Sequence, residues 1–126
     1  NLHIARHAIA AESDFGAGRI YGFDARVSPA AQPAMQQIAA ALAPLGIESL
    51  PGSGDPESDI GPATENGVAW AWLGHDGTDY FDLHHTPDDT LDKIDPAQLR
   101  QNVAAWTAVL GVLSGGIEEP KARKRR

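Results

Sequence analysis

Adjacent histidines and aspartates gather in the stretch FDLHHTPDDTLDKIDP, residues 81–96, which holds five aspartates in sixteen residues. His84 and His85 account for two of the five histidines in the chain. Imidazole nitrogens and carboxylate oxygens are the ligands that zinc and related cations take. A second acidic segment, ESD at residues 12–14, follows the first apolar stretch. The two segments are candidates for a metal site built from loops that meet at strand ends.

Spacing alone also allows a plainer interpretation, in which residues 81–96 form a surface loop that caps the next helix. Asp88, Asp89 and Asp92 are typical turn formers and helix-start acids. Asp95 has the position of an N-cap residue. Asp82 is placed to orient an imidazole through a hydrogen bond if the histidines bind metal. From spacing alone, the surface loop is the favoured interpretation.

Other chemistries find less support in the sequence. The GSG segment at residues 52–54 lacks the spacing and the Lys-Ser/Thr partner of a phosphate-binding loop. No GxSxG nucleophile elbow occurs. Two carboxylate pairs, Glu57 with Asp59 or Glu12 with Asp14, leave glycoside hydrolysis open as an alternative.

Composition narrows the class of protein further. A chain of 126 residues is long enough for one modest core. The net charge of −7 argues against a general nucleic-acid binder, and the absence of cysteine excludes disulfides and thiolate metal sites. No apolar run approaches the roughly 20 residues that span a membrane. The basic residues 117–126 are predicted to be a disordered tail, and the start at Asn1 leads us to expect trimming by processing or cloning.

Strands and loops are predicted from short apolar runs between turn residues. Residues 2–11, 47–50 and 67–73 are expected to be strands, the last one buried. Residues 51–62 are rich in glycine and proline and predict a loop. Trp70, Trp72 and, on the final helix, Trp106 are expected to pack in the core.

Two helices alternate with these strands, which indicates an α/β layered domain. The first helix begins at Ser28 with Pro29, or at Gln32 because Pro33 lacks an amide hydrogen. Its predicted apolar face carries Met35, Ile38, Leu42 and Leu45. The final helix begins with Asp95 as N-cap and Pro96 as its first residue. Its predicted apolar face carries Leu99, Val103, Trp106, Leu110 and Leu113.

Three segments together resemble a known family. They are HAIAAESDFGA at residues 7–17, GSGDPESDIGPATENGV at 52–68, and YFDLHHTPDDTLDKIDPAQL at 80–99. They stand in the order seen in the di-zinc exopeptidases of metallopeptidase family twenty-eight, which includes bacterial leucyl aminopeptidases. The ESD-x-G turn and the HH-[ST]-x-x-DT stretch are most similar to the carboxypeptidase Q branch. The resemblance extends from His7 to about Ser114.

The resemblance implies a three-layer α/β sandwich around a mixed sheet, with two zinc ions in each complete active site. The implied activity is that of an aminopeptidase or dipeptidase, which hydrolyses peptide bonds near a free amino terminus with a metal-activated water. Asp14 matches a terminal ligand of one zinc, and His85 matches a terminal ligand of the other. His84 stands where relatives often carry a tyrosine beside the substrate and the oxyanion. Ser58 and Asp59 match positions that line the substrate pocket.

The sequence also departs from this family. The HxD segment, the bridging aspartate and the Glu-Glu pair that holds the general base are missing. The resemblance therefore implies that residues 1–116 are the C-terminal portion of the catalytic domain. We expect this portion to be inactive without the N-terminal part of the same domain, and a periplasmic or extracellular location and a homo-oligomer are further expectations. Two alternatives are a non-catalytic peptidase-like binding module and an independently stable interaction domain, although the retained Asp14 and His85 favour the peptidase.

Overall fold

A computed structural model describes residues 3–115 and shows a mixed four-stranded sheet with helices packed on it. The strand order is β1-β4-β2-β3, in which β1 pairs parallel with β4, β4 antiparallel with β2, and β2 parallel with β3. The strands are β1 (Ile9–Ala10), β2 (Ile20–Arg26), β3 (Glu48–Ser49) and β4 (Ala69–His75). The α-helices are α1 (Gln32–Leu42), α2 (Glu57–Glu65), α3 (Tyr80–Leu83) and α4 (Pro96–Gly115). Short 3-10 turns span Ile4–Arg6, Pro29–Ala31, Ala43–Leu45 and Leu91–Lys93.

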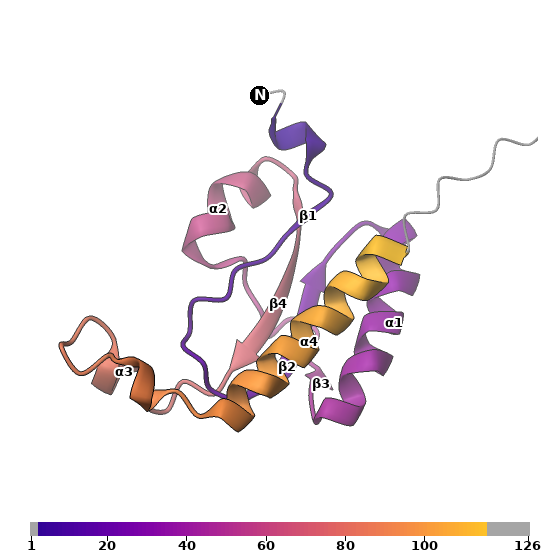
Figure 1. Cartoon of the computed structure of the whole chain (residues 1–126). Coiled ribbons are helices and arrows are strands. Elements are labelled where there is room, and N and C mark those ends of the chain that lie inside the picture. Colours follow the sequence, from indigo (N-terminus) through magenta and orange to yellow (C-terminus); the bar gives the residue numbers. More distant parts are fainter. Residues whose placement is uncertain (1–2, 116–126) are drawn as a thin grey trace, which may run out of the picture.

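The helices are arranged in layers on the sheet. α1 and α4 lie next to each other across one face, and α2 lies beside β1 away from them (Figure 1). This arrangement confirms the predicted α/β class with a mixed sheet. No helix in the described part of the chain is long and apolar enough to cross a membrane. The predicted basic tail, residues 117–126, lies outside the described residues.

The core fills the space between the sheet and the two long helices. α1 contributes its predicted face, of which Met35, Ile38 and Leu42 are buried and Leu45 beyond its end packs against them. The sheet contributes Ile20, Phe23, Ala71 and Leu73, and α4 contributes Ala105 and Val109. The face of α1 and the buried strand at residues 67–73 are therefore confirmed.

The opposite face of the sheet is covered by the loop after β3. Asp24, buried in the middle of β2, accepts hydrogen bonds from the backbone N–H groups of Gly52 and Gly54 at 2.9 and 3.0 Å. Trp72 of β4 lies under the same loop, and its ring meets that of Tyr21 edge-on. A carboxylate in a buried strand is tolerated because these donors satisfy it.

Some predicted elements differ from the observed ones. β1 is confined to Ile9–Ala10, preceded by a 3-10 turn, so the strand predicted for residues 2–11 is too long. The region predicted as a loop, residues 51–62, contains the start of α2, which keeps Pro62 inside the helix. The first helix begins at Gln32, the second of the two predicted starts. β2 had no counterpart in the prediction.

The buried face of α4 is not the one that apolar spacing predicts. Leu99, Val103 and Leu110 are 42%, 59% and 62% exposed, while the helix buries Gln101, Asn102, Ala105 and Val109. Only Trp106 and Leu113 of the predicted face pack against the core. The physical reason is that the buried face must satisfy backbone groups at and just before the start of β2 and the His75 side chain, which two amide side chains do and leucine does not.

Those two amides connect α4 to the ends of the central strands. Gln101 exchanges two hydrogen bonds with Ile20, at 2.9 Å to its N–H and 2.7 Å to its carbonyl. Asn102 donates to the carbonyl of Gly18 and accepts from His75, whose Nε2 lies 3.0 Å from its Oδ1. Because Oδ1 only accepts, Nε2 carries the hydrogen in this bond. Burial lowers the pKa of His75, so the imidazole is held neutral.

We expect the substitution Gln101→Ala to lower the free energy of unfolding by about 2 kcal/mol, because both polar backbone groups of Ile20 then lose a buried partner. Denaturant unfolding followed by circular dichroism measures the change. Arg100→Ala, at the exposed neighbouring position, is the matched control and is expected to change stability by less than about 0.5 kcal/mol. Equal losses in the two variants would contradict this role of Gln101.

Stability is expected to fall as the pH drops below the ordinary histidine pKa of 6.5. The pKa of His75 is lowered in the folded state, so below 6.5 the unfolded chain binds the proton more readily than the folded chain does. His75 then contributes a slope of up to about 1.4 kcal/mol per pH unit, until the pH reaches its folded-state pKa. Unfolding measured between pH 5 and 8 is predicted to show a shallower dependence in His75→Gln, and an unchanged slope would contradict the prediction.

Candidate functional site

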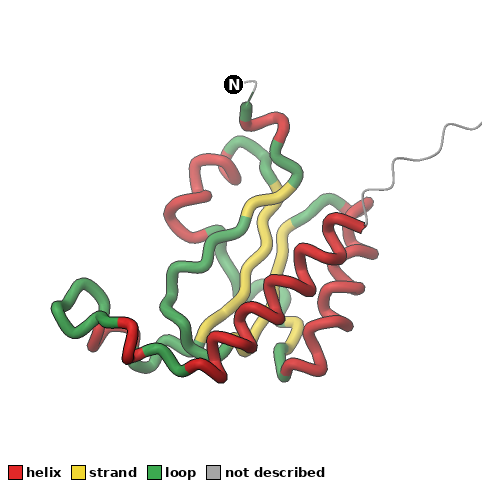
Figure 2. The backbone as a smooth tube through the Cα atoms, in the orientation of Figure 1, coloured by secondary structure: helices red, strands yellow, loops and turns green. Residues whose placement is uncertain are grey.

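The parallel pairing of β1 with β4 brings the two candidate metal-binding segments together. Ile9 and Ala10 align with Ala69 and Trp70, so the chain after β1 runs along β4 toward the same end of the sheet. Figure 2 shows this connection running beside β4. The ring of Phe15 stacks on the ring of Tyr80, with centroids 4.4 Å apart. The ESD turn therefore lies next to the segment that leads into the two histidines.

The histidines follow α3 in a tight turn. The N–H of His84 donates to the carbonyl of Tyr80 at 2.8 Å, and Thr86 donates through both N–H and Oγ1 to the carbonyl of Leu83. His85 takes a left-handed backbone conformation, with φ at 59°. Such a conformation is uncommon outside glycine and is often found at functional positions. The two imidazole rings stack with centroids 3.6 Å apart.

Glu12 connects the ESD turn to the start of α2. Its Oε2 accepts hydrogen bonds from the N–H groups of Asp59 and Ile60, at 2.8 and 3.3 Å. Its other oxygen, Oε1, is buried without a hydrogen-bond partner among the described residues. Ser58 and Asp59, both exposed, are thereby held near the ESD turn. From the sequence, Glu12 was considered only as one member of a carboxylate pair. No local pattern indicates that it accepts a hydrogen bond from a helix 47 residues away.

Acidic groups determine the electrostatics around these segments. Burial, with the charges of Asp14, Glu57 and Asp89, raises the pKa of the Tyr80 phenol, which therefore stays protonated at neutral pH. Burial, with the charges of Glu12, Asp55 and Asp14, raises the pKa of Glu57, and a hydrogen bond from Trp72 opposes this rise. Glu57 also has a positive φ of 58°. Neighbouring carboxylates therefore reinforce the effect of burial on the pKa of both groups.

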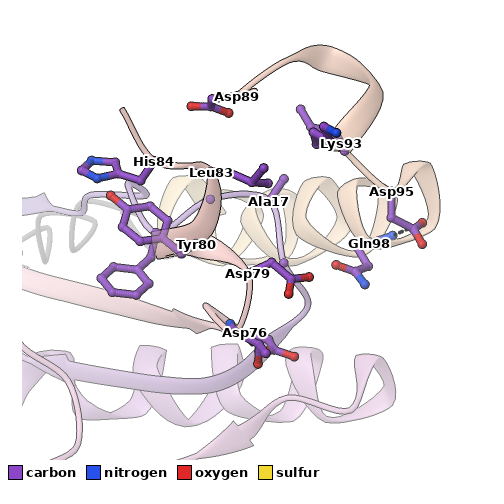
Figure 3. Close-up of a pocket in the computed structure, with 15 residues that line it drawn as sticks. Ala17, Asp76, Asp79, Tyr80, Leu83, His84, Asp89, Lys93, Asp95 and Gln98 are labelled. Atoms are coloured by element: carbon purple, nitrogen blue, oxygen red, sulfur yellow. Dashed lines mark hydrogen bonds between the residues drawn. The ribbon is translucent and has the colours of Figure 1, made fainter. Parts of the chain in front are cut away.

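A cavity of about 530 Å³ lies between α3 and the start of α4. Tyr80 and His84 line one end of it, and Lys93, Asp95 and Gln98 line the other (Figure 3). His84 lines this cavity, the other predicted site residues do not, and the place of His84 beside a substrate stays a prediction. Tyr80, which also lines the cavity, had no sequence signal beyond its position four residues before His84.

Most aspartates in residues 81–96 have structural partners. Asp88 pairs with Lys93 at 3.1 Å, Asp92 accepts from the Thr90 hydroxyl at 2.6 Å, and Asp95 accepts from the N–H of Ala97 at 2.6 Å. The predicted capping role of Asp95 is confirmed. Asp82 is exposed and makes no hydrogen bond to either imidazole among the described residues. The prediction that it orients a histidine therefore finds no support.

Unlike Asp88, Asp92 and Asp95, but like Asp82 and Asp89, the predicted ligands Asp14 and His85 have no side-chain hydrogen-bond or ion-pair partner within residues 3–115. Both are exposed, and within residues 3–115 neither takes part in a hydrogen bond or an ion pair. A carboxylate and an imidazole are suitable zinc ligands in type. Two ligands are too few to hold a zinc ion, and no group of three or more potential ligands lies together in the described part of the chain. A complete metal site would need ligands from outside these residues.

We expect Glu12→Ala to release the first turn of α2 and to lower the free energy of unfolding by about 1 kcal/mol, as the loss of a helix cap does. Hydrogen exchange at the Asp59 amide should become faster. Glu12→Gln keeps a carbonyl acceptor and is expected to retain most of the protection. Ser13→Ala, at the exposed next position, is the control, and unchanged Asp59 exchange in Glu12→Ala would contradict the role given to this carboxylate.

Comparison with known proteins gives a consistent result. The chain is 30% identical to carboxypeptidase Q from Homo sapiens over 118 residues, 94% of this chain and 25% of that protein. It is 32% identical to carboxypeptidase Q from Xenopus laevis over 103 residues, 82% of this chain and 22% of that protein. A crystal structure of a peptidase M28 precursor from Shewanella amazonensis is similar in fold, with a TM-score of 0.78 and 44% identity. That similarity covers 89% of this chain and 25% of the Shewanella chain.

These similarities cover most of this chain but only part of each relative. No protein-family profile matches the chain. The chain spans about a quarter of the length of the relatives that it matches. Sequence and fold agree with the resemblance expected from the ESD and HH segments. The chain belongs to the M28 metallopeptidases, as a segment that corresponds to about a quarter of such a protein.

Proposed function

We propose that this chain contributes part of the active site of a zinc-dependent exopeptidase, an aminopeptidase or dipeptidase that acts near a free amino terminus. The observation that carries the proposal is the meeting of the ESD turn and the HH loop, through Phe15 and Tyr80, in a chain similar to M28 peptidases. In the complete enzyme Asp14 and His85 would each ligate one of two zinc ions. The chemistry that zinc supplies in such sites is polarisation of the substrate carbonyl and activation of water.

The remaining roles fall to side chains around the cavity and α2. His84 lines the cavity and offers a ring nitrogen as hydrogen-bond donor to the developing oxyanion. Ser58 and Asp59 are exposed at the start of α2, where they would contact a peptide or dipeptide substrate. Glu12 fixes that turn by accepting from its N–H groups. The general base and the other ligands would come from the N-terminal part of the same domain, so the chain alone would be inactive.

An exported location, periplasmic or extracellular, completes the proposal. The relative from Shewanella amazonensis is named as a precursor, which is consistent with a processed protein.

The test uses the whole protein that carries this chain, with zinc content and hydrolysis of short peptides as readouts. Asp14→Ala and His85→Ala are each expected to reduce kcat/KM more than about a hundredfold and to lower the zinc content, because the loss of a ligand exceeds the usual effect of losing an outer partner. Asp82→Ala and His7→Ala, at exposed positions of the same residue types, are the controls and should change little. Substrates with free and acetylated amino termini distinguish an aminopeptidase from other peptidases.

The contrary outcomes are equally definite. Normal zinc content and hydrolysis in both ligand variants would reject the assignment of Asp14 and His85. A whole protein that binds no zinc and cleaves no peptide would favour the non-catalytic binding module. Hydrolysis by residues 1–126 alone would contradict the dependence on the rest of the domain.

A further inference from the structure

A continuous stack of four rings connects the ESD turn to His85. Phe15 stacks on Tyr80 with an interplanar angle of 13°, and Tyr80 stacks on His84 with centroids 4.6 Å apart. His84 stacks on His85 at 3.6 Å. We refer to Phe15, Tyr80, His84 and His85 as the ring stack; Figure 3 shows the Tyr80 and His84 rings beside each other. Near-parallel stacking restricts the orientation of each ring relative to its neighbour.

Two glycines, Gly16 and Gly77, lie against the rings of the stack. A Cβ atom at Gly77 would lie 2.7 Å from two ring carbons of Phe15, closer than carbon atoms approach. A Cβ atom at Gly16 would lie 3.5 Å from Tyr80, and Gly16 has a φ of 79° that favours glycine. The position of the Phe15 ring therefore depends on Gly77 for space, and the backbone turn beside it depends on Gly16 for its positive φ.

The two ends of the ring stack coincide with the two candidate ligands. Phe15 directly follows Asp14, and His85 is the last ring. His85 has no hydrogen bond within residues 3–115 to fix its imidazole, and its backbone takes an uncommon conformation. A metal-bound imidazole is normally oriented by a hydrogen bond from its second nitrogen. Among the described residues, the His85 ring contacts the face of the His84 ring, and this contact can orient the His85 imidazole in place of a hydrogen bond.

We propose that the ring stack, with Tyr80 as its positioning residue, sets the orientation of His85 and its spacing from the ESD turn. The metal-related part of this inference rests on the proposed function, in which His85 and Asp14 bind zinc. Tyr80 acts through the aromatic ring, since the ring contacts Phe15 on one face and His84 on the other. The phenol hydroxyl is not needed for this role.

The experiment compares Tyr80→Leu, which removes the ring, with Tyr80→Phe, which keeps it, in the whole protein that carries this chain. The first readout is the imidazole proton shifts of His84 and His85 in metal-free protein with ¹³C-labelled histidine. The second is the affinity for zinc alone, measured by competition with a chromogenic chelator. We expect Tyr80→Leu to change the imidazole shifts and to weaken zinc binding about tenfold, the usual effect of losing a residue that orients a ligand. Tyr80→Phe is expected to match the wild-type protein in both.

Phe81→Leu is the matched control, because Phe81 meets Phe15 and Tyr80 only edge-on and is 74% exposed. It should leave the shifts and the affinity unchanged. If Tyr80→Leu does not fold, Phe15→Leu removes the far ring and is expected to change both readouts in the same direction. Wild-type readouts in a folded ring-removing variant would overturn the inference, as would equal losses in Tyr80→Phe and Tyr80→Leu. If the wild-type protein binds no zinc, the proposed function fails. The imidazole shifts of the metal-free protein then still show whether Tyr80 positions His85.

Discussion

The parallel alignment of β1 with β4 is the constraint on which the candidate site depends. The two strands pair over only two residues each, Ile9 with Ala69 and Ala10 with Trp70. Because they run in the same direction, the chain leaves both strands toward the same end of the sheet, where loops commonly carry function. An antiparallel arrangement would have placed the ESD turn and the HH loop at opposite ends of β4. The contact of Phe15 with Tyr80 follows from this alignment.

The attachment of α4 shows the limit of apolar periodicity as a guide to burial. The helix has two candidate faces, and spacing selects the one with the larger apolar side chains. The sheet selects the other, since the ends of β2 and β4 present polar groups that Gln101 and Asn102 satisfy. Each such group would cost about 1–3 kcal/mol if it were buried without a partner, so the residues that pair with it must lie on the buried face. Periodicity identifies apolar surface, but it does not show which surface this chain covers.

How much of the fold the sequence predicts depends on whether its signals are local. The Asp95 cap, the face of α1 and the buried β4 rest on spacings within one element, and all three were predicted correctly. β2 gave no local signal, because Gly22 and the buried Asp24 interrupt its apolar pattern. α2 was hidden by Gly61 and Pro62, and it is stabilised by Glu12 from a distant turn. The candidate site shows the same pattern: Asp14 and His85 come from family-like segments and stay predictions, while the contacts of Glu12 with α2 and of Tyr80 with Phe15 are long-range.

Polar residues that look equivalent in the sequence differ in whether the fold uses them in hydrogen bonds. Glu12 and Asp14 belong to one turn, yet Glu12 accepts from two N–H groups and Asp14 is exposed without a donor among the described residues. Among the aspartates near the histidines, Asp88 and Asp92 are already used by Lys93 and Thr90. A hydrogen bond or ion pair uses part of the acceptor capacity of a carboxylate and fixes its direction, so the fold constrains these side chains. Asp14 and His85, on adjoining segments, stay the predicted ligands, and a metal would need further ligands to complete its site.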